Sequence, residues 1–252
     1  MELDALGMAA VFLTALAATA LSTMSGGGTE VILFPVFISL GIPIPLIIST
    51  AFSTNIFWTV PAAYNYLKAR TIDWKFVAVF SSIGLVGCFL GITTILTVQP
   101  RIYQIFIGAI ILFFVAYLYL NKDLGLHEKR EYSNTRGLYA YPFALILGFY
   151  EELLGVGNAI VLSILTFYTR GFDFIDSLGH YYLILLPWSI FSAGFLISLG
   201  YFDIWLVTLA IGGSVIGGYI GSRYARYKGN KFIKTLFVVI GGILGLKLLL
   251  GL

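Results

Sequence analysis

The sequence predicts an all-α polytopic membrane protein of two inverted-topology repeats, each with one broken, re-entrant helix hairpin and three full transmembrane helices. Hydrophobic residues make up 59 % of the chain and charged residues 11 %, against about 45–50 % and about 25 % in soluble proteins. Apolar stretches of about 20 residues, the length of a membrane-spanning helix, recur along the chain. We therefore expect the lipid bilayer as the surrounding medium and no nucleic-acid partner.

The repeats are visible as identical residues at a fixed spacing of 130. The pairs are Gly27/Gly157, Gly41/Gly171, Trp58/Trp188, Asp73/Asp203, Gly87/Gly217 and Gly91/Gly221. An internal duplication in an apolar chain is typical of transporters, which hold their substrate where the repeats meet. We divide the chain into a first repeat (residues 1–120), a linker (121–137) and a second repeat (138–252).

Hydropathy predicts three full-length spans in each repeat. They cover residues 46–67, 76–98 and 102–120 in the first repeat and residues 177–199, 204–222 and 232–250 in the second. Each is long enough to cross a hydrocarbon core of about 30 Å as a helix.

Two further apolar regions, residues 3–40 and 138–169, are interrupted by glycine-rich polar patches. The first patch reads Ser25-Gly-Gly-Gly-Thr-Glu30 and the second Leu154-Gly-Val-Gly-Asn158. The second region is too short for two complete spans and a turn. Because polar backbone at membrane depth is tolerated where it is buried or lines a cavity, we expect two short helices that meet at the glycines in each region.

The charges of equivalent loops predict that the two repeats are inverted. Residues 68–75 carry three basic side chains, and the equivalent residues 200–203 carry none. Conversely, residues 223–231 carry four basic side chains, and the equivalent loop of the first repeat carries only Arg101. Basic loops remain on the cytoplasmic side. We therefore expect a multi-pass protein of the cell (inner or plasma) membrane, with the linker in the cytoplasm and both termini outside. The sequence leaves the oligomeric state open.

Several short motifs occur in the same order in both repeats. The first repeat has the glycine-rich break with Pro35, then Leu40-Gly-Ile-Pro43, Ser49-Thr50 and Thr71-Ile-Asp-Trp74; the second has Gly155-Val-Gly-Asn158, Gly171, Gly179-His180, Asp203-Ile-Trp205 and glycines 213, 217 and 221. In this order they resemble the TauE/SafE family of sulfite-exporter-like permeases over nearly the whole chain. The resemblance implies an ion-gradient-driven exporter of sulfite, sulfonates, sulfoacetate or related small organosulfur anions.

The two glycine patches form the candidate substrate site. The N-terminus of a broken helix offers free N–H groups and a partial positive charge, and glycines let an anion approach the backbone. We expect the second arms of the hairpins to begin near Thr29 and Asn158 and to face each other across a pseudo-twofold axis. The predicted substrate contacts are Gly26, Gly27, Gly28, Thr29, Gly155, Gly157 and Asn158. The alternative is that these glycines only permit close helix packing.

Three carboxylates in apolar surroundings are candidates for proton coupling. A charge in the bilayer interior costs from about 2.5 kcal/mol upward, so Glu30, Glu151 and Glu152 are expected to be functional or to face a cavity. An ionised Glu30 would occupy the helix-terminal field that an anion needs, and its protonation would free that field. We therefore expect Glu30 to couple proton movement to anion binding, with simple helix capping as the alternative.

Asn55 and His180 are the other polar candidates for substrate contact. His180 takes the place of Thr50 in the repeat, and a histidine can both donate to an anion and titrate near neutral pH. A structural histidine and hydrogen bonding between helices are the alternatives for these two residues.

Two other classes of function remain as alternatives. A passive anion channel would need a lined pore, which broken helices allow. An intramembrane hydrolase is suggested by Glu151-Glu152, which resembles the opening of a membrane prenyl-endopeptidase motif, but no Arg follows and no GxSxG or HExxH motif is present. We expect no enzymatic activity, no cofactor and no metal. The expected partners are a small anion and a proton or other coupling ion.

Overall fold

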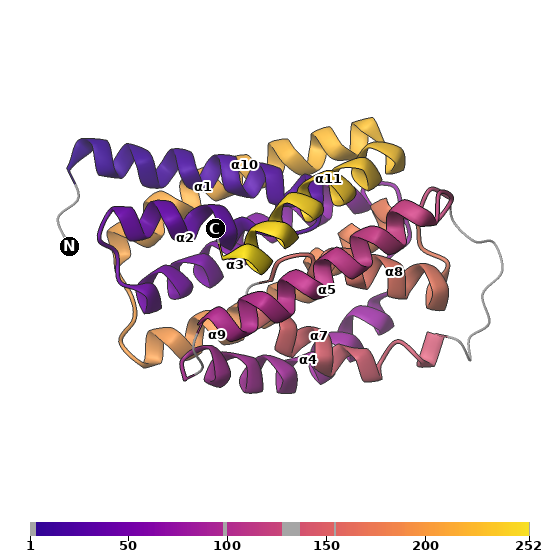
Figure 1. Cartoon of the computed structure of the whole chain (residues 1–252), viewed down its shortest axis with the longest axis horizontal. Helices are drawn as coiled ribbons and strands as arrows, with labels where there is room; N and C mark the ends of the chain where they lie inside the picture. The colour runs from indigo at the N-terminus through magenta and orange to yellow at the C-terminus, as the bar shows by residue number, and fades with distance from the viewer. Residues whose placement is uncertain (1–3, 98–99, 128–136, 154, 252) are drawn as a thin grey trace.

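The protein is a bundle of helices that lie side by side along the long axis of the molecule (Figure 1). A computed structural model describes residues 4–97, 100–127, 137–153 and 155–251. The helices of these ranges are α1 (Ala5–Ser25), α2 (Thr29–Ser39), α3 (Ile44–Leu67), α4 (Trp74–Ile95), α5 (Pro100–Leu120), α7 (Pro142–Leu153), α8 (Asn158–Arg170), α9 (Phe174–Ser198), α10 (Ile204–Lys228) and α11 (Asn230–Leu250). No strand occurs in the described ranges, so the all-α fold class is confirmed.

Six helices are long and apolar enough to cross a membrane: α1, α3, α4, α9, α10 and α11. The sequence predicts all of these except α1. The sixth predicted span is α5, a 21-residue helix of which the apolar part from Gly108 to Leu120 is described in full. The chain is therefore a multi-pass membrane protein by length and composition of its helices.

The first arm of the first hairpin differs from the sequence prediction. α1 is one uninterrupted helix of 21 residues, about 30 Å long, because no glycine or proline follows Gly7 until Gly26. The expectation of two short arms is wrong for this arm. α2 has 11 residues, α7 has 12 and α8 has 13, so the second hairpin has the two short arms that the sequence predicts.

The end of α10 also differs from the prediction. The sequence predicts a span that ends at residue 222, yet the helix continues to Lys228, and Gly229 at φ 82° ends it. The basic residues 223–228 thus extend the helix beyond its apolar part. Parts of the predicted linker (residues 128–136) and of the N-terminus (residues 1–3) lie outside the described residues.

The helix contacts of one half have counterparts in the other. α3, α4 and α5 begin at residues 44, 74 and 100, and α9, α10 and α11 begin at residues 174, 204 and 230. α1 packs on α10 and α7 packs on α4, while α3 packs on α9 and α5 on α11. The residues 130 apart in sequence therefore occupy corresponding helices.

Glycines make the closest of these contacts. A Cβ atom on Gly213 or Gly217 of α10 would collide with the backbone carbonyl of Phe12 or Leu16 in α1. Likewise, a Cβ atom on Gly87 of α4 would collide with the backbone of α7. The glycine repeats therefore have the packing role that this spacing indicates.

α3 and α9 form the centre of the bundle and carry side chains to the candidate site. The rings of Trp58 in α3 and Tyr182 in α9 lie 5.3 Å apart in edge-to-face contact. Tyr66 and Tyr182 both donate a hydrogen bond to the carbonyl of Thr23, at 2.7 and 3.2 Å. These bonds fix the end of α1, and thus the first glycine break, against the two central helices.

Candidate functional site

The two glycine-rich breaks touch each other in the interior of the bundle. Gly26, Gly27 and Gly28 have φ of 79°, 114° and 102°, and Gly155 and Gly157 have φ of 61° and 77°, which only glycine adopts readily. A Cβ atom on Gly27 would lie 2.7 Å from the carbonyl oxygen of Gly155 and 3.3 Å from the nitrogen of Gly157. The sequence-predicted meeting of the breaks is therefore present as backbone contact.

Both second arms begin at the breaks without a side-chain cap. α2 begins at Thr29 after Gly28, and α8 begins at Asn158 after Gly157. Neither N-cap glycine has a side chain that could accept from the first-turn N–H groups, which normally need such a partner. The two helix starts therefore present backbone donors and the positive ends of two helix dipoles.

A small cavity lies between the two breaks, and we call it the central cavity. Gly27, Gly28 and Thr29 line it from one break, and Gly155 lines it from the other. Its further walls include Glu30, Glu151, Asn55, Trp58 and Tyr181. Its volume of about 10 Å³ is close to the space that one water molecule needs. An anion larger than water therefore requires the surrounding helices to move.

A second cavity of about 10 Å³ shares two of these carboxylates with the central cavity. Glu30 and Glu151 line both cavities, and Glu152 lines the second one, which we call the carboxylate cavity. Its other walls are apolar, with Phe34 and Ile95 among them. Glu30 and Glu151 are thus common to the walls of the central cavity and the carboxylate cavity.

Hydrogen bonds fix the two carboxylates of the second hairpin. Glu151 Oε2 accepts from the side-chain amide of Asn158 and, at 2.9 Å, from the hydroxyl of Tyr181. Glu152 Oε1 accepts from the hydroxyl of Ser192 at 2.6 Å. Glu152 Oε2 is buried and has no hydrogen-bond partner in the described part of the chain. One buried acceptor therefore remains for a proton, a water molecule or a ligand.

Acidic side chains predominate around the two cavities. Glu30, Glu151 and Glu152 line the same small cavity, so their negative charges would repel one another if all three were ionised. No Lys or Arg is among the described residues that line either cavity. Like charges at short distance in a low-dielectric interior interact strongly. This arrangement favours a bound proton or another cation over three free carboxylates.

Two of the predicted glycine contacts pack helices instead of lining either cavity. A Cβ atom on Gly26 would lie 2.6 Å from the ring of Phe237 in α11, and one on Gly157 would lie 3.0 Å from Ile111 in α5. Gly26 and Gly157 thus pack closely against α11 and α5 in this structure. Gly27, Gly28, Thr29, Gly155 and Asn55 all line the central cavity, and Asn158 contacts it through Glu151.

The structure places His180 apart from the residues that line the two cavities. Its Nε2 accepts from the backbone N–H of Asp73 at 3.0 Å, so its Nδ1 donates to the carbonyl of Asp176 at 2.7 Å. The imidazole also packs on the ring of Phe172, with centroids 4.5 Å apart. Both ring nitrogens therefore have hydrogen-bond partners. The neighbouring Tyr181 lines the central cavity, and adjacent residues of a helix point in different directions, so His180 lies on another face of α9.

The sequence analysis missed Tyr181, Ser192 and Cys88. Tyr181 and Ser192 are 11 residues apart on α9, which places them on one helix face three turns apart. This spacing of polar groups in an apolar helix was the available signal. Cys88 of α4 lies near Glu152, and no sequence pattern pairs these two residues.

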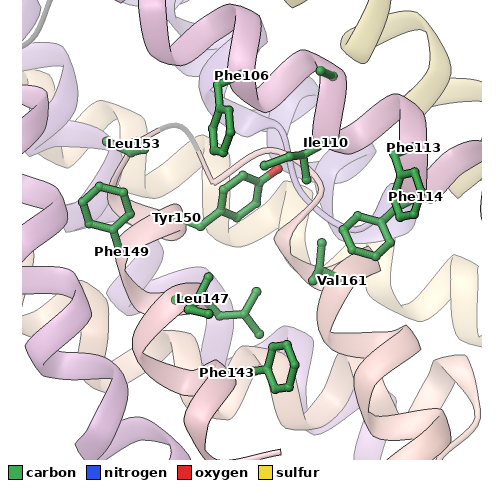
Figure 2. A pocket seen from close by; sticks show the side chains of 12 residues that line it. Phe106, Ile110, Phe113, Phe114, Phe143, Leu147, Phe149, Tyr150, Leu153 and Val161 are labelled. Carbon is green, nitrogen blue, oxygen red and sulfur yellow. The ribbon is translucent and has the colours of Figure 1, made fainter.

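A much larger pocket lies between α5, α7 and α8 (Figure 2). It has a volume of about 560 Å³, and Phe106, Phe113, Phe143 and Ile146 are among its apolar walls. The hydroxyl of Tyr150, which also lines it, donates to the carbonyl of Val156 at 2.6 Å. We call it the apolar groove. It offers a small anion no free polar group on these walls and is therefore unsuited to be the anion site.

Comparison with known proteins gives a consistent result. The family model described as "Sulfite exporter TauE/SafE" matches residues 11–248. Relatives include "Probable membrane transporter protein ORF9" of Sinorhizobium sp., which is 23 % identical over 96 % of this chain and 92 % of its own length. "Probable membrane transporter protein YdhB" of Bacillus subtilis is 24 % identical over 91 % of this chain and 94 % of its own length.

A third relative has a similar name and coverage. "Probable membrane transporter protein YfcA" of Escherichia coli K12 is 23 % identical over 95 % of this chain and 88 % of its own length. No solved structure gives a significant match. The family and the relatives together identify the chain as a membrane transporter.

Proposed function

Because this chain belongs to the TauE/SafE family of sulfite exporters, we propose that it is a secondary transporter of small sulfur-containing anions. Sulfite, sulfonates and sulfoacetate are the candidate substrates, and an ion gradient drives their export. The observation that carries this proposal is the contact of two uncapped helix starts around one cavity, at Gly27 and Gly155. Paired helix N-termini at the meeting point of two repeats suit an anion.

The transporter consists of two inverted repeats, residues 1–120 and 138–252, joined by the linker 121–137. Three observations support this arrangement: the helix starts 130 residues apart, the reciprocal packing of α1 on α10 and α7 on α4, and the opposite charge of equivalent loops. Rocking of one half against the other then exposes the central cavity to each side in turn.

The sidedness follows from the same loop charges. The protein lies in the cell membrane with its linker in the cytoplasm and both termini outside, because the basic residues of loop 68–75 and of residues 223–231 belong on the cytoplasmic side. A reporter fused to the C-terminus tests this: activity of an alkaline phosphatase fusion is expected, and activity of a green fluorescent protein fusion would contradict it.

The substrate anion binds the backbone N–H groups at the starts of α2 and α8. The carboxyl group of Glu30 lies in the first turn of α2, so when it is ionised it competes with an anion for the positive end of this helix. Asn55 and Tyr181 line the same cavity and supply side-chain polar groups. Gly27 and Gly155 leave room for the anion next to the backbone.

Protons are the coupling ions, and Glu30, Glu151 and Glu152 carry them. No Lys or Arg among the described lining residues compensates these carboxylates, so an anion and three carboxylate charges exclude one another. Protonation of Glu30 removes one negative charge from the start of α2, where the anion binds. Binding of the anion and binding of the proton therefore favour each other.

A binding assay tests the substrate class without knowledge of the driving ion. The purified protein is heated with sulfite, thiosulfate, sulfonates or short carboxylates. A true substrate raises the unfolding temperature by mass action, with about 2.7 kcal/mol of stabilisation at a concentration 100 times its Kd. We expect at least one sulfur-containing anion to raise the unfolding temperature of the native protein, and we expect this rise to be lost in Asn55→Leu. Stabilisation by carboxylates alone would contradict the substrate class.

Transport measurements separate a coupled carrier from a passive channel. In proteoliposomes, a coupled carrier accumulates its anion above the equilibrium level when a proton gradient is imposed, whereas a channel only lets the anion run downhill. We expect accumulation that a protonophore abolishes. Downhill flux alone would favour the channel.

A further inference from the structure

Two loops at one end of the bundle exchange charged residues. The loop between α3 and α4 supplies Arg70 and Asp73, and the connection between α8 and α9 supplies Arg170 and Asp173. Arg70 Nη1 donates to both carboxylate oxygens of Asp173 at 3.0 Å, and Arg170 Nη1 donates to Asp73 Oδ2. We call Arg70–Asp173 and Arg170–Asp73 the reciprocal ion pairs, because each loop gives one cation and one anion.

Each reciprocal ion pair has supporting contacts. Arg70 Nη1 also lies 2.7 Å from Asp176 Oδ2. Burial lowers the pKa of Arg70, but the hydrogen bonds and negative charges of Asp176 and Asp173 raise it by more, so this guanidinium stays charged. Arg170 lies 4.1 Å above the ring centroid of Phe76 and donates to the hydroxyl of Tyr141 at 3.1 Å. Two different side-chain environments thus hold the two cations.

The reciprocal ion pairs are partly shielded from solvent. The exposed fraction of the side chain is 5 % for Asp173 and 7 % for Arg170. Ion pairs with this burial depend on their partners, because removal of one partner leaves an uncompensated charge. They are therefore stronger candidates for a conformational lock than exposed pairs, which contribute little.

Both pairs join the two halves of the chain at the same end. A further contact between the halves occurs there: Arg226 of α10 donates to the carbonyl of Asn65 in α3 at 2.7 Å. Within the second half, Asn230 at the start of α11 donates to Asp173 Oδ2 at 2.9 Å, and it also donates to the carbonyl of Leu126 in the linker at 3.0 Å. Charged groups thus fasten the halves where separation would open this end.

α8 connects this end to the central cavity. The helix begins at Asn158 beside the central cavity and ends at Arg170, about 20 Å away. Asp173 in turn caps α9, whose next turns carry Tyr181 to the cavity. A movement of α8 or α9 that widens the central cavity toward this end must therefore displace Arg170 or Asp173.

We propose that the reciprocal ion pairs are a gate that closes the central cavity toward the side of loops 68–73 and 171–173. This inference rests on the proposed transport function. The gate is closed in the structure described above, and it opens when Arg70 and Arg170 release Asp173 and Asp73. Release of both pairs shifts the population toward the conformation that is open to this side.

Two substitutions remove the charge of the gate without loss of the helix caps. Asp73 Oδ1 accepts from the N–H of Phe76 at 2.9 Å, and Asp173 Oδ1 accepts from the N–H of Asp176 at 2.8 Å. Asparagine caps a helix as well as aspartate does, so Asp73→Asn with Asp173→Asn keeps both caps. The matched control is Asp203→Asn, because Asp203 is the repeat counterpart of Asp73 and caps α10 through Trp205 and Leu206 at 3.0 Å.

The readout is access to the central cavity from each side of the membrane. Cys88 is replaced by Ala. Ser22, which lines the central cavity, is replaced by Cys, so that this cysteine carries the only thiol of the protein. Membrane vesicles of both orientations are treated with a membrane-impermeant thiol reagent. We expect the double variant to be labelled about tenfold faster from the gate side, the population shift expected from loss of two partly shielded pairs. Asp203→Asn is expected to change nothing.

Thermal unfolding of each variant accompanies the labelling. If the double variant does not fold, Arg70→Gln replaces it, because it removes one gate charge without touching a cap and is expected to speed labelling about threefold. An unchanged labelling rate from the gate side in a folded variant would overturn the gate. Labelling needs no substrate, so the two proposals fail separately. Absence of anion transport by the native protein would count against the proposed function, whereas faster labelling of the double variant from the gate side would still support the gate.

Discussion

The two hairpins differ in length, charge and packing. α1 of the first hairpin has 21 residues and packs against α11, whereas α7 of the second has 12 residues. The apolar groove of about 560 Å³ separates α7 from α5 (Figure 2). Among the lining carboxylates, the first hairpin contributes Glu30, and the second contributes Glu151 and Glu152. The shorter, less tightly packed hairpin therefore holds more of the ionisable groups.

This difference assigns separate tasks to the hairpins. The first hairpin is fixed by α10, by α11 and by two tyrosine hydroxyls on the carbonyl of Thr23. The second is held by α4 and by the hydrogen bonds of Glu151 and Glu152. We expect the first hairpin to be the reference for the anion site and the second to change conformation when its carboxylates gain or lose protons.

The largest expected effect comes from Gly27, where the hairpins touch. Gly27→Ala would place a Cβ atom 2.7 Å from the carbonyl of Gly155 at φ 114°. Strain and overpacking together are expected to cost about 2–4 kcal/mol, seen as a lower unfolding temperature and lost transport. The matched control is Gly41→Ala. Gly41 also has a positive φ of 74°, but an added Cβ atom there would meet no atom within 4 Å, so this substitution should cost about 1 kcal/mol of folding stability. Equal losses would refute the contact between the hairpins.

The next effect concerns the carboxylate that lines both cavities from the second hairpin. Glu151→Gln keeps the size of the side chain and a group that Tyr181 can donate to, but it cannot exchange a proton. Uptake driven by a proton gradient is expected to fall by at least about tenfold, while exchange of anion for anion continues. Both rates are measured in the same proteoliposomes. An equal fall in proton-driven uptake and in anion exchange would show that Glu151 has a structural role and no role in proton coupling.

Glu30 tests the first hairpin in the same way. In the native protein transport should decline as the pH rises, because ionised Glu30 occupies the donors at the start of α2. Glu30→Gln removes this ionisation, so its transport rate should become less dependent on pH. The rate is measured from pH 5 to 9 in buffers of equal ionic strength. If Glu30→Gln has the same pH profile as the native protein, the proposed coupling role of Glu30 is contradicted and helix capping is favoured.

The smallest effect is expected beside the apolar groove. Tyr150→Phe leaves the buried carbonyl of Val156 without the donor that now lies at 2.6 Å, a loss of about 1–3 kcal/mol in stability. Tyr64→Phe is the control, since Tyr64 is 61 % exposed and its hydroxyl is expected to matter little. Thermal unfolding compares the two. Identical unfolding temperatures would show that this bond does not hold the second break.

Periodicity and breakers predict most of the fold because hydrophobic length decides it. α3, α4, α9 and α11 lie where apolar runs of the right length end at loops. α1 is missed because the glycine patch after it suggests two short arms, although nothing interrupts the helix before Gly26. α10 exceeds its prediction because basic residues continue a helix beyond the membrane until a glycine stops it.

The candidate site is predictable in its backbone and less so in its side chains. Positive φ at Gly27 and Gly155 follows from their glycine identity, and their contact follows from the repeat. The hydrogen-bond partners of Glu151 and Glu152 come from α8 and α9, and such long-range pairing has no sequence pattern. The hydrogen bonds of His180 to Asp73 and Asp176 are not predictable from the sequence, because an offset of 130 gives the position of His180 along α9 but not its face.

The most direct test of the account is accumulation of sulfite by reconstituted protein under an imposed proton gradient. The native protein, Glu151→Gln and Gly41→Ala are compared at equal reconstitution. The account predicts that the native protein and Gly41→Ala accumulate sulfite above its equilibrium level until a protonophore is added, and that Glu151→Gln does not. Accumulation by Glu151→Gln at the native level would contradict an anion site whose loading depends on these carboxylates.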